Sequence, residues 1–261
     1  MTERLPLNLP TRRNEKLRNL VARIDHDVEL HTLWQCANIN AVDRAGITDH
    51  GQVHVKIVAN IALKLVRLLI DADVPIGVVR DHGMTTDEAE IVVVLAACLH
   101  DLGISIHRSN HEQYSLFLAE RKARELLDGL YDVRERTIVV AETLHAVIAH
   151  RWDQVCLTTE AGVVKVADAL DVTEGRSRIP FEAGKTDIHS ISALAIDRVD
   201  IRKGDEIPII IEIAMNNSAG IFQVDELLKR KLRSSSIAPY VQVLARIEGE
   251  TEKRILEFYS F

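Results

Sequence analysis

The spacing of apolar residues divides the chain into a helical part and a strand-rich part. Up to about residue 175, apolar positions recur with a period near 3.6, which is typical of helices that bury one face. The pattern predicts helices near 14–45 (interrupted about Asp25–Asp27), 50–71, 86–101, 110–128, 133–150 and 159–173. Thr85, Ser109 and Asp132 each precede a glutamate by three residues, which is typical of a helix start.

After Pro180 the period falls to about 2, which indicates strands. Strands are predicted at 191–201, 207–216, 240–248 and 254–260, with a helix at 220–233 between two hairpins. A β-β-α-β-β order favours a small antiparallel sheet with one helix on a face. We therefore expect a mainly α-helical domain over residues 1–183 and a small α+β domain over 184–261 with a regulatory, dimerising or lid role.

Polar residues interrupt three of the apolar helical faces. His100-Asp101 ends the apolar stretch Ile91–Cys98, while His54 and Asp168 break the faces of two other predicted helices. Buried charges need a partner or a metal to offset lost hydration, and nitrogen with oxygen ligands suits Mg²⁺, Mn²⁺, Fe or Zn²⁺. An isolated His-Asp pair is more simply a hydrogen bond at a helix end, but here three helices carry such groups. Gly103 is expected to end the helix beside them.

The order of these residues, His, then His-Asp, then Asp, resembles the HD-domain superfamily of metal-dependent phosphohydrolases. The resemblance covers roughly residues 25–180 and includes the strings AAxLHDLG and ADALD. It implies that the first metal is bound by His54, His100, Asp101 and Asp168.

The resemblance also implies two further histidine ligands for a second metal. His111 is preferred to His107 because it begins a string similar to the family's ligand-bearing helix. His150 is preferred to His145 because Leu144, Val147 and His150 recur at intervals of three, as in the family pattern. For each of these histidines the alternative is a surface or supporting role. If two metals bind, Asp101 is the expected bridge between them.

Other residues are candidates for the chemistry around the metals. His50 precedes His54 by one helical turn, which is similar to the HNxxH string of cyclic nucleotide phosphodiesterases and implies a general acid, although an ordinary place after Asp49 is the alternative. The substrate phosphate needs cations, and the residues near the motifs are Arg108, Arg151, Lys165, Arg176 and Arg178. Among these we favour Arg176 and Arg178, which directly follow the last ligand helix, and an ordinary surface loop is the alternative.

The expected function is a metal-dependent phosphohydrolase, either a phosphomonoesterase or a phosphodiesterase. Its cofactor would be one or two divalent ions (Mn, Fe, Mg, Zn, Ni or Co) that activate water as hydroxide and polarise the phosphoryl oxygen of a nucleotide or related compound. Two alternatives stay open: a di-iron oxygenase of the HD type acting on a small polar substrate, and a non-catalytic signalling or scaffold module.

Composition is consistent with this expectation. A net charge of −7 and a pI near 5.9 disfavour nonspecific nucleic-acid binding. Cys36, Cys98 and Cys156 form no CxxC pair, and no apolar run is long enough for a membrane span, so a cytoplasmic protein is expected. A homodimer is a further expectation. The basic run 229–233 is interpreted as a solvated helix end, with anion binding as the alternative.

Overall fold

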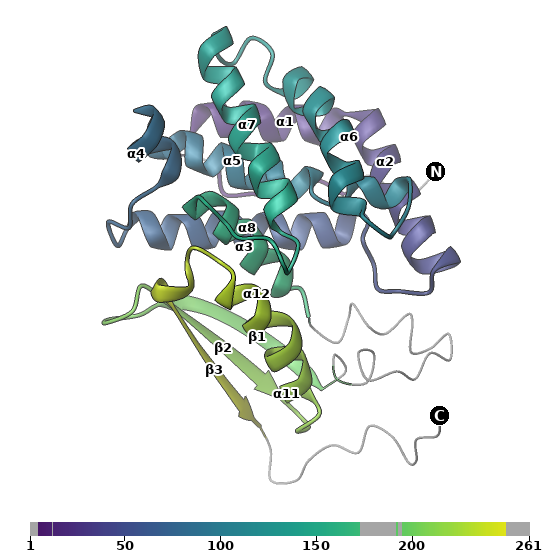
Figure 1. Ribbon diagram of the computed structural model, residues 1–261, viewed down its shortest axis with the longest axis vertical. Helices are drawn as coiled ribbons and strands as arrows, with labels where there is room; N and C mark the ends of the chain where they lie inside the picture. Colours follow the sequence, from purple (N-terminus) through teal and green to yellow (C-terminus); the bar gives the residue numbers. More distant parts are fainter. Residues whose placement is uncertain (1–4, 12, 173–191, 193–194, 249–261) are drawn as a thin grey trace.

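The computed structural model describes residues 5–11, 13–172, 192 and 195–248 (Figure 1). The helical part contains α1 (Glu15–His26), α2 (Val28–Asn38), the π-helical turn η1 (Ile39–Arg44), α3 (Gln52–Ile70), α4 (Gly77–His82), α5 (Thr86–Leu99), the 3-10 turn η2 (Leu102–Ser105), α6 (His111–Leu126), α7 (Val133–Ala149) and α8 (Thr159–Ala169). The predicted break at Asp25–Asp27 is confirmed, because Asp27 ends α1 and accepts a hydrogen bond from the Leu30 N–H at the start of α2.

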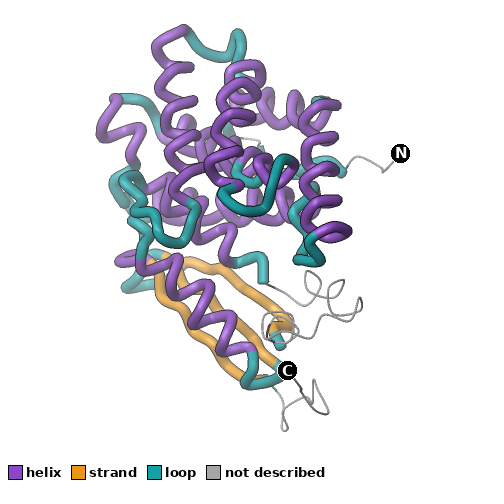
Figure 2. The backbone as a smooth tube through the Cα atoms, turned by 45° about the vertical axis from the view of Figure 1, so that its right-hand side comes forward, coloured by secondary structure: helices purple, strands orange, loops and turns teal. Residues whose placement is uncertain are grey.

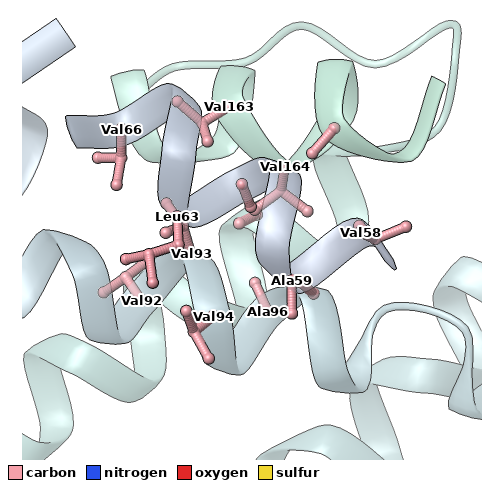
Figure 3. Close-up of a cluster of buried hydrophobic side chains, with 14 of the residues drawn as sticks. Val58, Ala59, Leu63, Val66, Val92, Val93, Val94, Ala96, Val163 and Val164 are labelled. Carbon is pink, nitrogen blue, oxygen red and sulfur yellow. The ribbon is translucent and has the colours of Figure 1, made fainter. Parts of the chain in front are cut away.

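Helix α5 is the centre of the helical part. Every residue from Glu88 to Leu99 is buried, as expected for the apolar run Ile91–Cys98. Helices α3, α7 and α8 pack around it, and Figure 3 shows side chains of α3, α5 and α8 meeting in one apolar cluster. Its start is fixed by the expected capping box. The Thr85 side chain accepts a hydrogen bond from a backbone N–H of the first turn, and the Glu88 side chain accepts one from the Thr85 N–H. The end of α5 is therefore held at a defined place in the interior.

The C-terminal region combines three described strands with one helical stretch. The strands are β1 (Ile196–Lys203), β2 (Ile209–Met215) and β3 (Val241–Ile247), in the order β1-β2-β3. The helical stretch is continuous through α11 (Gly220–Phe222), η3 (Gln223–Lys229) and α12 (Arg230–Arg233), and the 3-10 turn η4 (Ala238–Tyr240) precedes β3. Figure 2 shows the helix lying along one face of the strands. The predicted α+β class and the helix at 220–233 are thus confirmed.

The prediction of an antiparallel sheet is correct for β1 and β2 but wrong for β3. Strands β1 and β2 pair antiparallel, whereas β3 pairs with β2 in parallel, with Val241 opposite Ile209. The helix between β2 and β3 returns the chain to the end at which β2 began, and this crossover places the two strands in the same direction. The sheet is therefore mixed. The predicted fourth strand at 254–260 and the domain boundary near residue 183 lie outside the described residues.

Two expected helix boundaries differ from the structure. Asn110, not Ser109, is the residue before α6, and its backbone has a left-handed conformation. Gly103 does not end α5 with a left-handed backbone but lies in η2, against the first turns of α6. A Cβ at Gly103 would lie 2.0 Å from the backbone oxygen of His111. The glycine thus permits close packing of η2 on α6. None of the described helices is both long and apolar enough to cross a bilayer.

We predict that Gly103→Ala destabilises the protein by about 1–3 kcal/mol, because the added methyl group overlaps the backbone of α6 and no flexible side chain can yield there. Denaturant unfolding measures this change. The control is Gly83→Asn: Gly83 has a positive φ that Asn tolerates, and no atom lies near its added Cβ, so the expected cost is below about 1 kcal/mol. Equal stability of Gly103→Ala and the wild type would contradict this account of the packing.

Candidate metal centre

Six side chains that the sequence singles out lie together in the interior of the helical part. They come from five places in the fold: His54 from the first turn of α3, His100 and Asp101 from the end of α5, His111 from the start of α6, His150 from the end of α7, and Asp168 from the last turn of α8. The first five are buried, and the Asp168 side chain is the most exposed of the six, at 13%. Three helix ends and two helix starts therefore converge on one polar centre.

Asp101 lies between two pairs of histidines. Its Oδ2 is 3.4 Å from Nε2 of His54 and 3.2 Å from Nε2 of His100. Its Oδ1 is 3.0 Å from Nε2 of His111 and 3.7 Å from Nε2 of His150. A single carboxylate thus presents one oxygen to each pair.

Asp168 adds a second carboxylate on the side of the first pair. Its Oδ1 lies 3.4 Å from Nε2 of His54 and 3.8 Å from Nε2 of His100. Three overlapping groups of potential ligand atoms result, in each of which all atoms lie within 4.8 Å of one another: His54 with His100 and Asp101, Asp101 with His111 and His150, and His100 with His150 and Asp168. Imidazole nitrogens mixed with carboxylate oxygens suit Zn²⁺, Mn²⁺ or Fe, so these residues fit divalent metal binding.

The opposite ring nitrogens of three histidines are tied to fixed acceptors. Nδ1 of His54 lies 2.6 Å from Oδ2 of Asp171. Nδ1 of His100 donates to the Ala97 carbonyl at 2.9 Å, and Nδ1 of His150 donates to the Val147 carbonyl at 2.5 Å. When Nδ1 carries the proton, Nε2 keeps its lone pair for a cation, which is the usual arrangement of metal-binding histidines. The rings are therefore oriented and tautomerically suited to coordination through Nε2.

The fourth histidine is held by Arg108. Nδ1 of His111 lies 3.1 Å from the Arg108 carbonyl and 2.7 Å from its Nη1. The carbonyl requires a proton on Nδ1, whereas the guanidinium requires a lone pair there. Its tautomer is thus less firmly set than those of the other three. The same contact places the Arg108 guanidinium at the edge of the centre.

The sequence at the end of α5 explains the position of His100. The last carbonyls of a helix lack partners within it, and here two of them accept hydrogen bonds from side chains. Ala96 accepts from the His100 N–H and Ala97 accepts from the His100 ring, while the Trp34 indole of α2 donates to Cys98 at 2.9 Å. The backbone of α5 and the metal centre therefore share hydrogen bonds, and neither can shift alone.

The buried charges change one another's ionisation. Burial raises the pKa of Asp101, but the neighbouring His100, His111 and His54 together hold it well below its usual range. Burial lowers the pKa of His100, yet Asp101 and Asp168 outweigh this effect and raise it to about 10. Both carboxylates are thus ionised at neutral pH. The centre attracts cations, and without a metal one is supplied by protonated His100.

Burial acts in opposite directions on the pKa of Asp168 and that of His150, while positive neighbours lower both. Burial raises the pKa of Asp168, but the charge of Lys231 and the contact with His100 hold it well below its usual range. For His150, burial and then the positive charge of His100 keep the pKa well below its ordinary value. His150 is therefore neutral, which is the form in which a histidine binds metal.

The other residues expected at the site have different surroundings. His50 lies beside His54, with ring centroids 5.4 Å apart, and its Nδ1 donates to the Thr48 carbonyl at 2.6 Å. Arg151 pairs with Asp153 at 2.8 Å. The two histidines that we ranked lower, His107 and His145, accept backbone N–H groups of Ser109 and Leu157 instead of joining the cluster. Arg176 and Arg178 lie outside the described residues.

Two residues at the centre were missed by sequence reasoning. Asp171 binds Nδ1 of His54, and its signal was its place three residues after Asp168 in ADALD. Lys231 of α12 donates to Oδ2 of Asp168. For Lys231 the interpretation of the run 229–233 as a solvated helix end is wrong, because a basic run has the same appearance whether it faces water or a carboxylate.

Comparison with known proteins agrees with this geometry. An HD domain family model matches residues 51–173, a range that contains all six clustered residues. The chain is also similar to the uncharacterized protein MJ1020 of Methanocaldococcus jannaschii, with 42% identity over 222 residues that cover 85% of this chain and 86% of that protein. No solved structure matches. The chain belongs to the HD-domain superfamily of metal-dependent phosphohydrolases.

Proposed function

We propose that the protein hydrolyses a phosphoester with the help of two divalent metal ions. The observation that carries this proposal is the position of Asp101, whose two oxygens face two different pairs of histidines. His54, His100, Asp101 and Asp168 would hold one ion, and Asp101, His111 and His150 the other. Bound divalent ions lower the pKa of water to supply the nucleophile and polarise a phosphoryl oxygen.

The residues of the chain fix the geometry of this chemistry. Asp171 and the backbone carbonyls of α5 and α7 orient the histidine rings, so little reorganisation is needed when substrate enters. His50 lies just before the start of α3, with its ring centroid 5.4 Å from that of His54. Because its Nδ1 donates to the Thr48 carbonyl, Nε2 is the atom that would transfer a proton to the leaving oxygen. We propose His50 as the general acid on this ground.

The six-residue donor set also favours a second candidate. Two histidine pairs joined by one carboxylate would suit two irons that activate oxygen, which is the alternative raised by the sequence. The two functions differ in their need for oxygen. Phosphate release from a phosphoester under argon supports hydrolysis, whereas iron content with oxygen uptake on a small polar substrate supports the oxygenase.

We expect Asp101→Asn to lower turnover of a phosphoester by a factor of about 10³ or more, because the amide keeps the size of the side chain but removes the charge between the two histidine pairs. Phosphate release from a panel of phosphoesters measures this change, and chelation of the wild type followed by return of metal should abolish and restore it. The control is Asp225→Asn, an exposed carboxylate on the C-terminal helix, which should retain full activity. Undiminished hydrolysis by Asp101→Asn or by the chelated protein would refute the mechanism.

Metal affinity should depend on pH in a defined direction. Burial lowers the pKa of His100, but Asp101 and Asp168 raise it to about 10 in the metal-free protein, so a metal must displace this proton. The affinity is then weakest at low pH, rises by about tenfold per pH unit, and levels off above about pH 10. Titration calorimetry near pH 7 in buffers of different protonation enthalpy should report about one proton released. An affinity that is constant from about pH 6 to 9 would contradict this assignment.

A further inference from the structure

The end of the C-terminal helix lies against the metal-binding half of the molecule. Figure 1 shows α12 next to α8, and Lys231 of α12 donates to Oδ2 of Asp168. On the same turn, the Arg230 guanidinium lies 4.3 Å from the ring centroid of Trp152, two residues after His150. Residues far along the chain therefore contact Asp168, one of the six clustered residues, and Trp152, close in sequence to another.

The residues that follow α12 pack against α8 through contacts that do not involve Lys231. The Ser235 hydroxyl donates to the Gly162 carbonyl at 3.2 Å, and the Ser236 hydroxyl donates to the Thr158 carbonyl at 2.6 Å. A Cβ at Gly162 would lie 2.3 Å from Oγ of Ser236, so the glycine allows the two backbones to approach closely. Buried Lys165 also donates to the hydroxyl of Ser234 at 2.9 Å. These contacts hold the end of α12 against α8. The backbone of Lys231 is therefore positioned by packing and not by its own ion pair.

The two oxygens of Asp168 face different partners. Oδ1 points to the Nε2 atoms of His54 and His100, while Oδ2 accepts from Lys231. A metal bound through Oδ1 would thus leave the contact between Oδ2 and Lys231 intact. The ammonium lies on the side of Asp168 that faces away from this histidine pair.

The ion pair of Lys231 and Asp168 is more accessible to solvent than the histidines of the centre, so a substrate would meet it first. The side chains of Lys231 and Asp168 are 19% and 13% exposed, whereas those of His54 and His100 are fully buried. Solvent therefore reaches the centre at the Asp168 edge. A phosphoester that approaches along this edge brings its anionic oxygens next to the ammonium.

The chemistry of an ammonium suits this position. Lysine has three N–H donors, so a hydrogen bond to Asp168 leaves donors for phosphoryl oxygens. A mostly buried ion pair gains little net stability, because desolvation of the two charges offsets much of their attraction, so stability is a weak reason for this arrangement. Lys165, the other lysine close by, has its ammonium directed to the Gln154 carbonyl and Ser234.

We propose that Lys231 binds the phosphoryl group of the substrate, so that the C-terminal α+β region supplies a substrate-binding residue of the active site. This inference rests on the proposed phosphohydrolase function and adds a residue to it from outside the matched HD segment. Lys231 holds the phosphoryl oxygens at the Asp168 edge, while the six clustered residues hold the metals.

The test is a calorimetric titration of the metal-loaded full-length protein with inorganic phosphate. Lys231→Ala should weaken phosphate binding by about ten- to hundredfold, because one charged hydrogen-bond donor is lost. Lys231→Gln keeps most of the side-chain length and should show the same loss if Lys231→Ala folds poorly. The matched control is Lys229→Ala on the same helix, whose lysine pairs with Asp225 and should leave phosphate affinity unchanged.

Two accompanying measurements separate substrate binding from support of Asp168. Metal content should stay at the wild-type value in both Lys231 variants, and KM for a phosphoester should rise more than kcat falls. Unchanged phosphate affinity, or loss of metal together with phosphate, would overturn the inference. Failure of the proposed function has a different signature, because the metal-loaded wild type would then release no phosphate from any phosphoester. The phosphate titration measures the contribution of Lys231 to binding and does not require turnover.

Discussion

The ionised carboxylate of Asp101 at the end of the most buried helix is the constraint on which the structure depends. Such a charge in an apolar interior is stable only with nearby positive charge or a metal. Here α3, α6 and α7 each bring a histidine within 4 Å of its oxygens. The packing of these helices on α5 is therefore also the assembly of the site, and a shift of one helix would leave the carboxylate short of a partner.

The same constraint extends to the C-terminal region. Asp168 carries a second buried negative charge, and Lys231 from α12 compensates it on the side that the histidines leave open. The chain that follows α12 packs against α8 and approaches it most closely at Gly162. This packing links the mixed sheet to the metal centre. The helical part supplies the metal-binding residues and, in our proposal, the α+β region supplies a contact to the substrate.

Sequence reasoning succeeded where the signal is local. The apolar run of α5 predicted the central helix, and polar residues that break apolar helical faces predicted the buried positions of His54 and His100. It failed where pairing is decided in three dimensions. The parallel direction of β3 follows from the helical crossover, and α4 exists as a short helix because Glu160 of α8 caps its first N–H groups from a distance. The contact of Lys231 with Asp168 likewise has no local sequence signal.

The central claim is that Asp101 joins two metal sites. Anomalous diffraction from crystals of the protein purified without chelator tests it most directly, because it locates each metal independently of activity. The account predicts two peaks about 3.5–4 Å apart on either side of the Asp101 carboxylate, one next to His54 and His100 and the other next to His111 and His150. A fully loaded protein with one peak, or with a second peak away from His111 and His150, would contradict it.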